Sequence, residues 1–217
     1  MIKIKRIKCG FVNCYILSEN GRAVLIDTGT AKYREKILSL SERNNVELIV
    51  LTHGHIDHIQ NSAYLAAELN VPIAVGEGDE ELIFDHNLQP LKSGSLFGRA
   101  MEAVSNWSME NLLCPMFIPT LLLKEGDILE KFGVTAKIIA LPGHTDGSIG
   151  VDAAGRYLFA GDAIMNFVCP KPPAVYTNKE KASDSVEKIK ALGDRKIYFG
   201  HGKPIHMVKA EFKEETP

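Results

Sequence analysis

The chain has 217 residues, of which 45% are hydrophobic and 24% charged, and its formal net charge at pH 7 is −2. This length and apolar content predict one folded domain with a substantial core and exclude a disordered chain. The balanced charge, without a block of basic residues, argues against nucleic acid as the main partner, and no apolar run is long enough to span a membrane.

The first residues predict strands. Residues 2–7 alternate apolar and basic side chains, a strand pattern that lacks the continuous apolar core of a secretory signal. Residues 11–17 and 23–26 are rich in β-forming side chains, and the turn-forming run 18–21 lies between them. We therefore expect an antiparallel hairpin at this end of the sheet.

A strand–helix–strand segment follows. Asp27-Thr28-Gly29 ends the third strand in a sharp loop, and residues 33–40 carry apolar side chains on one helical face. Residues 46–51 predict a buried strand, residues 63–69 a second helix and residues 71–75 a short strand. This order places the helices on an outer face of the sheet.

The most distinctive stretch of the chain comes directly after the buried strand. Three histidines and an aspartate fall within six residues there: His53, His55, Asp57 and His58. Imidazole is a good ligand for zinc and iron, and a carboxylate can ligate or orient beside it. The carboxyl end of such a strand is where ligand sites of α/β sheets lie. We expect His53 and His55 to converge on one point and His58, at a helix start, to face a second.

Residues 76–124 form the least regular part of the sequence. Prolines and glycines are interspersed there with methionines and other large apolar residues, so the segment is too apolar to be disordered. Two interpretations stay open. One is an apolar insertion that covers a hydrophobic substrate or makes a homodimer contact. The other is a pair of helices packed on the domain.

The second half of the chain is again rich in predicted strands. Residues 134–141, 148–151 and 156–160 predict strands, residues 180–192 a helix, and residues 196–199 a last strand. Each half therefore runs strands, helix, strand. Two halves packed sheet against sheet would fit this order.

Three further ligand candidates lie at strand ends of the second half. His144, Asp162 and His201 each follow an apolar strand and each stand beside a glycine. Glycine permits the tight backbone paths by which a loop presents a side chain to a shared centre. The pattern therefore predicts that both halves of the chain contribute ligands to one metal centre.

Five segments together carry a resemblance to a known family. They are Leu25-Ile26-Asp27-Thr28-Gly29, Thr52-His53-Gly54-His55-Ile56-Asp57-His58, Pro142-Gly143-His144-Thr145, Gly161-Asp162 and Gly200-His201-Gly202. In this combination and order the sequence resembles the metallo-β-lactamase fold superfamily, over about residues 11–204. The resemblance implies an α/β fold, the four-layer αββα sandwich, with a two-metal site in the cleft between the sheets.

The resemblance also implies how the ligands divide. One metal ion would take His53, His55 and His144. The other would take Asp57, His58 and His201, and Asp162 would bridge the two ions. Asp27 would orient the histidine loop, unless it serves only to cap the turn after its strand. Both ions are expected to be zinc, with iron or manganese as alternatives, because histidine–carboxylate sites accept all three.

The implied activity is that of a metal-dependent hydrolase. Two divalent ions lower the pKa of a shared water, and the resulting hydroxide would attack an ester, lactone or thioester of a small molecule. Asp57 would orient that nucleophile or carry its proton. One rival is a persulfide dioxygenase with a single iron, which resembles this chain in length and uses only ligands equivalent to His53, His55 and His144. Another is a non-catalytic member of the family that uses the fold for binding.

Departures from particular branches narrow the substrate. Antibiotic-hydrolysing relatives often carry cysteine where this chain has Asp162, which argues against penicillin hydrolysis. Glyoxalase II relatives add a helical substrate domain, whereas 16 residues follow His201 here. RNA-processing relatives carry large insertions or a basic arm, and flavodiiron relatives replace a histidine of the first run with a carboxylate. None of these features is evident in this sequence.

The remaining candidates fall outside the family pattern. The four cysteines, Cys9, Cys14, Cys114 and Cys169, have no close-paired metal spacing, which predicts free thiols in a reducing, cytoplasmic location. A redox pair of Cys9 and Cys14 is the alternative. His86 and His206 are expected at the surface. Tyr176 would either donate a hydrogen bond to a substrate carbonyl, as a tyrosine does in the similar lactonases, or pack as an ordinary half-buried tyrosine.

Overall fold

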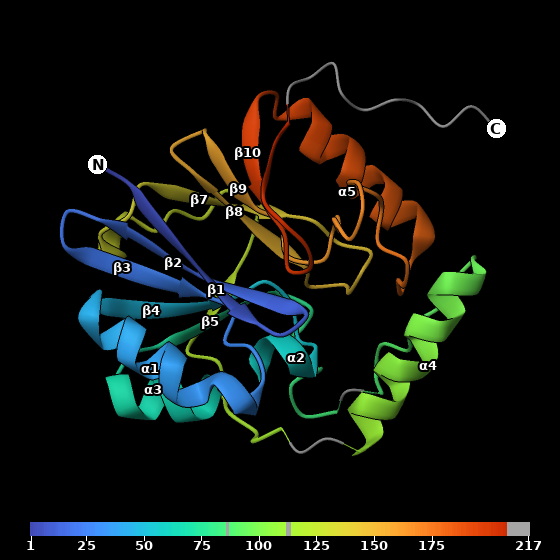
Figure 1. Ribbon diagram of the computed structural model, residues 1–217, viewed down its shortest axis with the longest axis horizontal. Coiled ribbons are helices and arrows are strands. Elements are labelled where there is room, and N and C mark those ends of the chain that lie inside the picture. Colours follow the sequence, from blue (N-terminus) through green and yellow to red (C-terminus); the bar gives the residue numbers. More distant parts are fainter. Residues whose placement is uncertain (86, 112–113, 208–217) are drawn as a thin grey trace.

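The computed structural model describes residues 1–85, 87–111 and 114–207. Two β-sheets pack face to face, and helices cover the outer face of each sheet (Figure 1). This arrangement confirms the predicted αββα sandwich.

The first sheet has six strands in sequence order. They are β1 (Lys3–Cys9), β2 (Val12–Glu19), β3 (Arg22–Ile26), β4 (Val46–Leu51), β5 (Ile73–Gly76) and β6 (Leu121–Leu123). The first three strands are antiparallel, as the hairpin signals predicted, and the other pairs are parallel. Because β3, β4 and β5 are parallel, the loops after them meet at one edge of the sheet.

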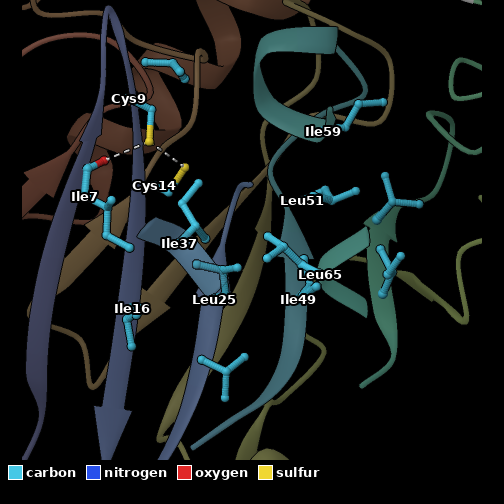
Figure 2. Packing of buried hydrophobic residues seen from close by; sticks show 14 of the residues in the cluster. Ile7, Cys9, Cys14, Ile16, Leu25, Ile37, Ile49, Leu51, Ile59 and Leu65 are labelled. Atoms are coloured by element: carbon cyan, nitrogen blue, oxygen red, sulfur yellow. Dashed lines mark hydrogen bonds between the residues drawn. The ribbon is translucent and has the colours of Figure 1, made fainter. Parts of the chain in front are cut away.

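Short helices connect these parallel strands. They are η1 (Ala31–Tyr33), α1 (Arg34–Arg43), α2 (Ile56–Ile59) and α3 (Ser62–Leu69). Ile37 of α1 and Leu65 of α3 are fully buried against the outer face of the sheet, beside Leu25 and Ile49 (Figure 2). The apolar side chains of both helices therefore face the sheet, as the helical spacing of these residues in the sequence predicted.

The second sheet has five strands in the order β11-β10-β9-β8-β7. They are β7 (Ala136–Ala140), β8 (Ile149–Ala153), β9 (Tyr157–Phe159), β10 (Arg195–Tyr198) and β11 (Ile205–Met207). A 3₁₀ turn, η2 (Glu130–Phe132), precedes them. Helix α5 (Lys179–Ala191) covers the outer face of this sheet, where Ile189 packs against Leu158 and Ile197 (Figure 1).

The inner faces of the two sheets form a central core. Tyr15 and Val50 from the first sheet pack in one cluster with Ile138, Val151 and Phe159 from the second. The rings of Tyr15 and Phe159 meet edge to face, with their centroids 5.3 Å apart. Burial of alternating residues on both inner faces fixes the strand registers, and hence the positions of the loops at the strand ends.

Residues 76–124 contain one long helix, α4 (Leu96–Asn111), and end in β6 at the edge of the first sheet. One interpretation of the sequence was a pair of helices in this segment. Its described residues form one α-helix instead. In Figure 1, α4 stands apart from α1 and α3, at the end of the molecule near α2. The two short strands, β6 and β11, were not predicted from the sequence. In the described ranges, no helix is both long and apolar enough to cross a membrane.

Candidate metal centre

The structure brings together all seven side chains that the sequence predicted as ligands. They are His53, His55, Asp57, His58, His144, Asp162 and His201. The first four follow β4, and the others follow β7, β9 and β10 respectively. Side chains as far apart in the chain as His55 and His144, which are 89 positions apart, thus meet where the ends of both sheets converge.

His53, His55 and His144, here named the trihistidine group, face one point. Their ring centroids lie 4.7–4.8 Å apart in every pairing. His144 Nε2 lies 3.0 Å from His55 Nδ1. The group offers three nitrogen atoms within 4.8 Å of one another and is buried throughout, which suits a divalent ion that prefers nitrogen ligands.

Asp57, His58 and His201, here named the carboxylate group, face a second point. Asp57 Oδ2 lies 3.3 Å from His201 Nε2 and 3.7 Å from His58 Nε2. The Asp57 side chain is 43% exposed, so this group opens toward solvent.

Asp162 stands between the two groups. Its Oδ2 lies 3.2 Å from His201 Nε2 and 3.7 Å from His144 Nε2, and its Oδ1 lies 3.6 Å from His58 Nε2. One buried carboxylate therefore reaches nitrogen atoms of both groups.

Protein acceptors hold three of the imidazoles through Nδ1. His58 Nδ1 lies 2.9 Å from Asp27 Oδ2, His144 Nδ1 donates to the carbonyl of Val175 at 2.8 Å, and His201 Nδ1 donates to the carbonyl of Phe11 at 3.0 Å. Such bonds fix the tautomer and leave the Nε2 lone pair free to face a cation.

Four buried polar atoms at the centre have no hydrogen-bond partner. They are Nε2 of His53, His55 and His58, and Oδ1 of Asp162. Buried polar atoms are rarely left unpaired in folded proteins, and atoms that ligate a metal ion are a common exception. The donor set of nitrogen and carboxylate oxygen therefore fits a site for divalent metal ions, judged from the side chains alone.

The two groups differ in charge when no metal is bound. Burial lowers the pKa of His53 and His55 well below the usual value for histidine, and repulsion from neighbouring imidazoles adds to this effect. Burial also lowers the pKa of His144. The trihistidine group is consequently neutral at pH 7, with its lone pairs available.

In the carboxylate group, attraction overcomes burial. Burial disfavours the charged form of His58, but Asp57, Asp162 and Asp27 outweigh this and raise its pKa to about 9. The pKa of His201 is likewise raised, by Asp162 and Asp57 against the effect of burial. The pKa values of both aspartates are held well below their usual range by His58 and His201, although burial acts in the opposite direction. This group is a cluster of ion pairs at neutral pH.

Asp27 fixes the start of the histidine loop, as expected from the sequence. Its Oδ1 accepts a hydrogen bond from the backbone N–H of Thr52 at 2.8 Å, and its Oδ2 lies beside His58 Nδ1. Asp27 adopts a left-handed backbone conformation (φ +58°), which is costly for a residue other than glycine. These contacts hold it in that conformation.

Asp79 was not predicted from the sequence. This buried carboxylate accepts hydrogen bonds from the N–H of Gly54 (2.8 Å), the hydroxyl of Thr145 (2.7 Å) and the N–H of Gly147 (2.8 Å). Asp79 therefore ties the loop that carries His53 and His55 to the loop that carries His144. An acidic residue in a Gly-rich turn gives no sequence signal for this role, because Gly54, Thr145 and Gly147 are distant from it in the sequence.

At two positions beside the ligands, neighbouring atoms come so close to the backbone that only glycine fits. A Cβ at Gly200 would lie 2.0 Å from Asp162 Oδ1, and a Cβ at Gly161 would lie 2.6 Å from the Thr52 Oγ1. Gly161 also has a left-handed φ of +51°. The Gly–Asp and Gly–His pairs found in the sequence thus have a direct steric reason.

A cavity of about 590 Å³ opens beside the centre. Asp57, His55, His144, Asp162 and His201 contribute to its lining. Most of the remaining lining comes from the β1–β2 turn, from α4 and from residues 165–175.

Among the other candidates in the described parts of the chain, Cys9 lines this cavity and His206 does not. His206 lies on the exposed side of β11, as expected, and His86 lies outside the described residues. Tyr176 is not among the lining residues that the structure describes, and a Cβ at Gly94 would come within 3.2 Å of its hydroxyl. Tyr176 is half-buried, and a hydrogen bond from it to substrate stays a prediction. All four cysteines are free, and Cys9 Sγ lies 3.8 Å from Cys14 Sγ (Figure 2).

Comparison with known proteins gives one family. A family model described as the Metallo-beta-lactamase superfamily matches residues 7–201. The chain is 31% identical over 195 residues to hydroxyacylglutathione hydrolase 1 of Vibrio vulnificus, a match that covers 86% of this chain and 60% of that protein. It is 30% identical over 157 residues to hydroxyacylglutathione hydrolase GloC of Haemophilus influenzae, covering 70% of this chain and 66% of that protein.

A solved structure agrees with the fold. The crystal structure of TTHA1623 in a di-iron-bound form superimposes with a TM-score of 0.69 at 25% sequence identity, covering 93% of this chain and 94% of that one. The aligned region of this chain spans 60–66% of the length of the two curated relatives named above.

Proposed function

This chain belongs to the metallo-beta-lactamase superfamily, and we propose that it is a metal-dependent hydrolase that cleaves an ester, lactone or thioester bond of a small molecule. The observation that carries the proposal is the set of unpartnered buried atoms on His53, His55, His58 and Asp162, which face one centre from both halves of the fold. Hydrolase names among the relatives support the same reaction class.

We assign the ligands as the geometry groups them. The trihistidine group would hold one divalent ion and the carboxylate group a second, with Asp162 between them. Both ions are proposed to be zinc, with iron or manganese as alternatives, because this donor set accepts all three. When bound, such a pair lowers the pKa of water into the neutral range and polarises a carbonyl oxygen.

The protein side chains have separate tasks in this proposal. Asp57 lines the cavity and is ionised, so it can orient the attacking water and accept its proton. Asp27 and the carbonyls of Val175 and Phe11 hold the imidazoles in fixed orientations. Helix α4 and the β1–β2 turn line the cavity where the substrate would bind.

A thioester is the first substrate bond to examine. The two curated relatives named above are hydroxyacylglutathione hydrolases, and a thioester bond is therefore proposed as a candidate for this chain, without carrying over the glutathione part. Oxygen esters and lactones present the same acyl carbon to the same centre, and they remain in the proposal.

The test is removal and return of metal. Protein stripped with a chelator should lose hydrolysis of a panel of esters, lactones and thioesters, and two equivalents of zinc should restore it. Activity that survives with less than 0.1 metal ion per chain, roughly a tenth of one site, would overturn the proposal.

A persulfide dioxygenase with a single iron is the second candidate. One observation favours it: the carboxylate group already balances its own charges, whereas the trihistidine group is neutral and ready for one ion. One iron per chain, with oxygen consumed on addition of a persulfide, would select the dioxygenase. Two zinc ions with no oxygen uptake would select the hydrolase.

Two further predictions concern the cellular location and the oligomeric state of the protein. A cytoplasmic location is supported by the four free cysteines, two of which lie in thiol contact without a bond. A homodimer through residues 76–124 stays a prediction, and sedimentation velocity would decide it.

A further inference from the structure

The cavity beside the metal centre has apolar walls. Phe11 at the β1–β2 turn, Met101 and Val104 on α4, and Met165 and Phe167 in the loop after β9 all line it. Phe11 is 90% exposed and Val104 66% exposed, so this apolar surface faces open space. Large apolar side chains that remain exposed around a site commonly mark the place where an apolar ligand binds.

Helix α4 presents a single stripe to the cavity. Its lining residues are Ala100, Met101, Val104, Ser105 and Ser108, which recur at helical spacing along one face. Ala103 on the same helix is exposed and lies outside this lining. One face of α4 therefore forms a wall of the cavity, and the neighbouring face does not.

The charged groups that line the cavity all belong to the metal centre. The charged side chains of the lining are Asp57, Asp162 and His201, and no lysine or arginine is present among the lining residues in the described parts of the chain. Away from the centre, the lining residues with polar side chains are Cys9, Thr30, Tyr33, Ser105 and Ser108, none of which is a cation. A carboxylate or phosphate on the substrate would lose water there without gaining a cation, which is a large cost.

We infer that the cavity binds an uncharged, apolar acyl chain, so that the preferred substrates are esters or thioesters of medium-chain carboxylic acids, or the corresponding alkyl lactones. This inference rests on the proposed hydrolase function and narrows its substrate class. Hydrolysis adds water across the acyl bond: a C–O bond forms, the acyl–oxygen or acyl–sulfur bond breaks, and the alcohol or thiol leaves with a proton. The products are that alcohol or thiol and a fatty acid, or a single hydroxy acid when the substrate is a lactone, without any redox change.

Glutathione thioesters should then be poor substrates. Glutathione carries two carboxylates, and each would require a cationic partner or exposure to water. The described lining offers no such partner. A thioester of the same acyl group with a small neutral thiol should therefore react faster than the glutathione thioester.

The test uses metal-loaded enzyme and p-nitrophenyl esters with acyl chains of two to ten carbons. We expect kcat/KM to rise about fourfold for each added methylene until the cavity is filled, which is the value of burying one CH₂ group. Esters of equal length that end in a carboxylate should fall well below the apolar series. A flat or falling chain-length series, or equal rates with carboxylate-ended esters, would overturn the inference while the hydrolase proposal stands. Loss of the whole series would instead contradict the hydrolase proposal.

A charge variant sharpens the same test. Val104→Lys places a cation on the lining face of α4, whereas Ala103→Lys places one on the neighbouring face as a matched control. Val104→Lys should raise the ratio of carboxylate-ended to apolar substrate roughly fivefold, as a partly exposed ion pair would, and Ala103→Lys should leave the ratio unchanged. Equal ratios in both variants would show that α4 does not line the bound substrate.

A binding measurement separates recognition from catalysis. The uncharged dye N-phenyl-1-naphthylamine should bind the metal-free protein, and decanamide should displace it. Val104→Lys should weaken dye binding, and Ala103→Lys should not. Equal dye affinity for both variants, or displacement of the dye by short dicarboxylates as readily as by decanamide, would count against an apolar acyl site.

Discussion

Asp162 lies between the trihistidine group and the carboxylate group, which differ in protonation: the first is neutral, and the second is a cluster of ion pairs. Burial leaves His53, His55 and His144 neutral, so their lone pairs are ready for a cation. His58 and His201 instead carry protons that the neighbouring aspartates stabilise. A metal ion can enter the first group directly, but it must displace protons from the second.

Two adjacent sites with such different charges should not fill alike. The trihistidine group should bind the first ion, and the carboxylate group should bind the second with an affinity that rises with pH. Variants at the ligands and at the residues that hold them test this order of filling.

The strongest loss of activity is expected from a ligand of the trihistidine group. His144→Ala should lower kcat/KM by more than the roughly 10⁴-fold that a positioned acid–base group can supply, because it removes the first ion. His201→Ala should lose only the second ion and keep about one per chain. Metal content measured by mass spectrometry on both variants decides the point. Equal metal loss in the two would break the proposed order of filling.

The next effect concerns Asp57, the most exposed member of the carboxylate group. Asp57→Asn should lower kcat by about 10²–10⁴-fold, because the amide cannot accept the proton of the attacking water. Asp146→Asn is the matched control, since Asp146 is an exposed aspartate that pairs with Lys181. Stopped assays at saturating substrate give kcat for both. An Asp57→Asn variant with unchanged kcat and unchanged metal content would remove Asp57 from the chemistry.

A more modest effect is expected at Asp79, which links the two loops of the trihistidine group. Both of its oxygens accept hydrogen bonds, from Gly54 and Thr145 on one and from Gly147 on the other. In Asp79→Asn, either orientation of the amide places an NH₂ group against a donor. We expect first-ion affinity to fall about 10–100-fold, as when an outer-shell partner of a metal ligand is changed.

Competition with a chromophoric chelator measures that affinity. Asp152→Asn is the control, because Asp152 is also a buried carboxylate but pairs with Arg195 in the second sheet. If both variants keep the affinity of the unchanged protein, Asp79 does not position the histidines.

Sequence patterns were sufficient for the strand ends and for the seven side chains of the centre. Each of these follows an apolar strand in a short run that contains glycine, so both the strand and the loop can be recognised from neighbouring residues. Asp79 was not predictable, because its partners on Gly54, Thr145 and Gly147 lie near it only after both sheets have formed.

Helix α4 was missed in the sequence analysis for a different reason. Prolines and glycines in residues 76–124 suggested irregular structure, yet no proline lies between Leu96 and Asn111. Ser95 supplies a start signal, since its hydroxyl accepts a hydrogen bond from the N–H of Gly98 at 3.0 Å. That signal was available in the sequence, but the face of α4 that lines the cavity depends on how the helix packs in the fold.

The weakest effect is a change in the stability of the metal-free protein with pH. The folded-state pKa values of His53 and His55 lie below the unfolded value near 6.5, so the unfolded chain binds more protons as the pH falls below 6.5 and stability is lost there. The folded-state pKa of His58 is raised to about 9, so its contribution is complete below pH 6.5 and is lost as the pH rises toward 9. The two groups thus predict a stability maximum near pH 6.5, with opposite slopes on either side.

Thermal melts of chelator-treated protein between pH 5 and 9 should show this maximum as a change of a few degrees in Tm on each side, since about 1 kcal/mol shifts the Tm of a chain of this size by roughly 2–4 °C. His58→Asn should flatten the alkaline slope, and His55→Asn should flatten the acid slope. Zinc should remove the alkaline slope, because the ion replaces the protons that the carboxylate group otherwise loses. If His58→Asn and His55→Asn both change the same side of the plot of Tm against pH, the two histidines do not differ in protonation, and the proposed difference between the two groups is wrong.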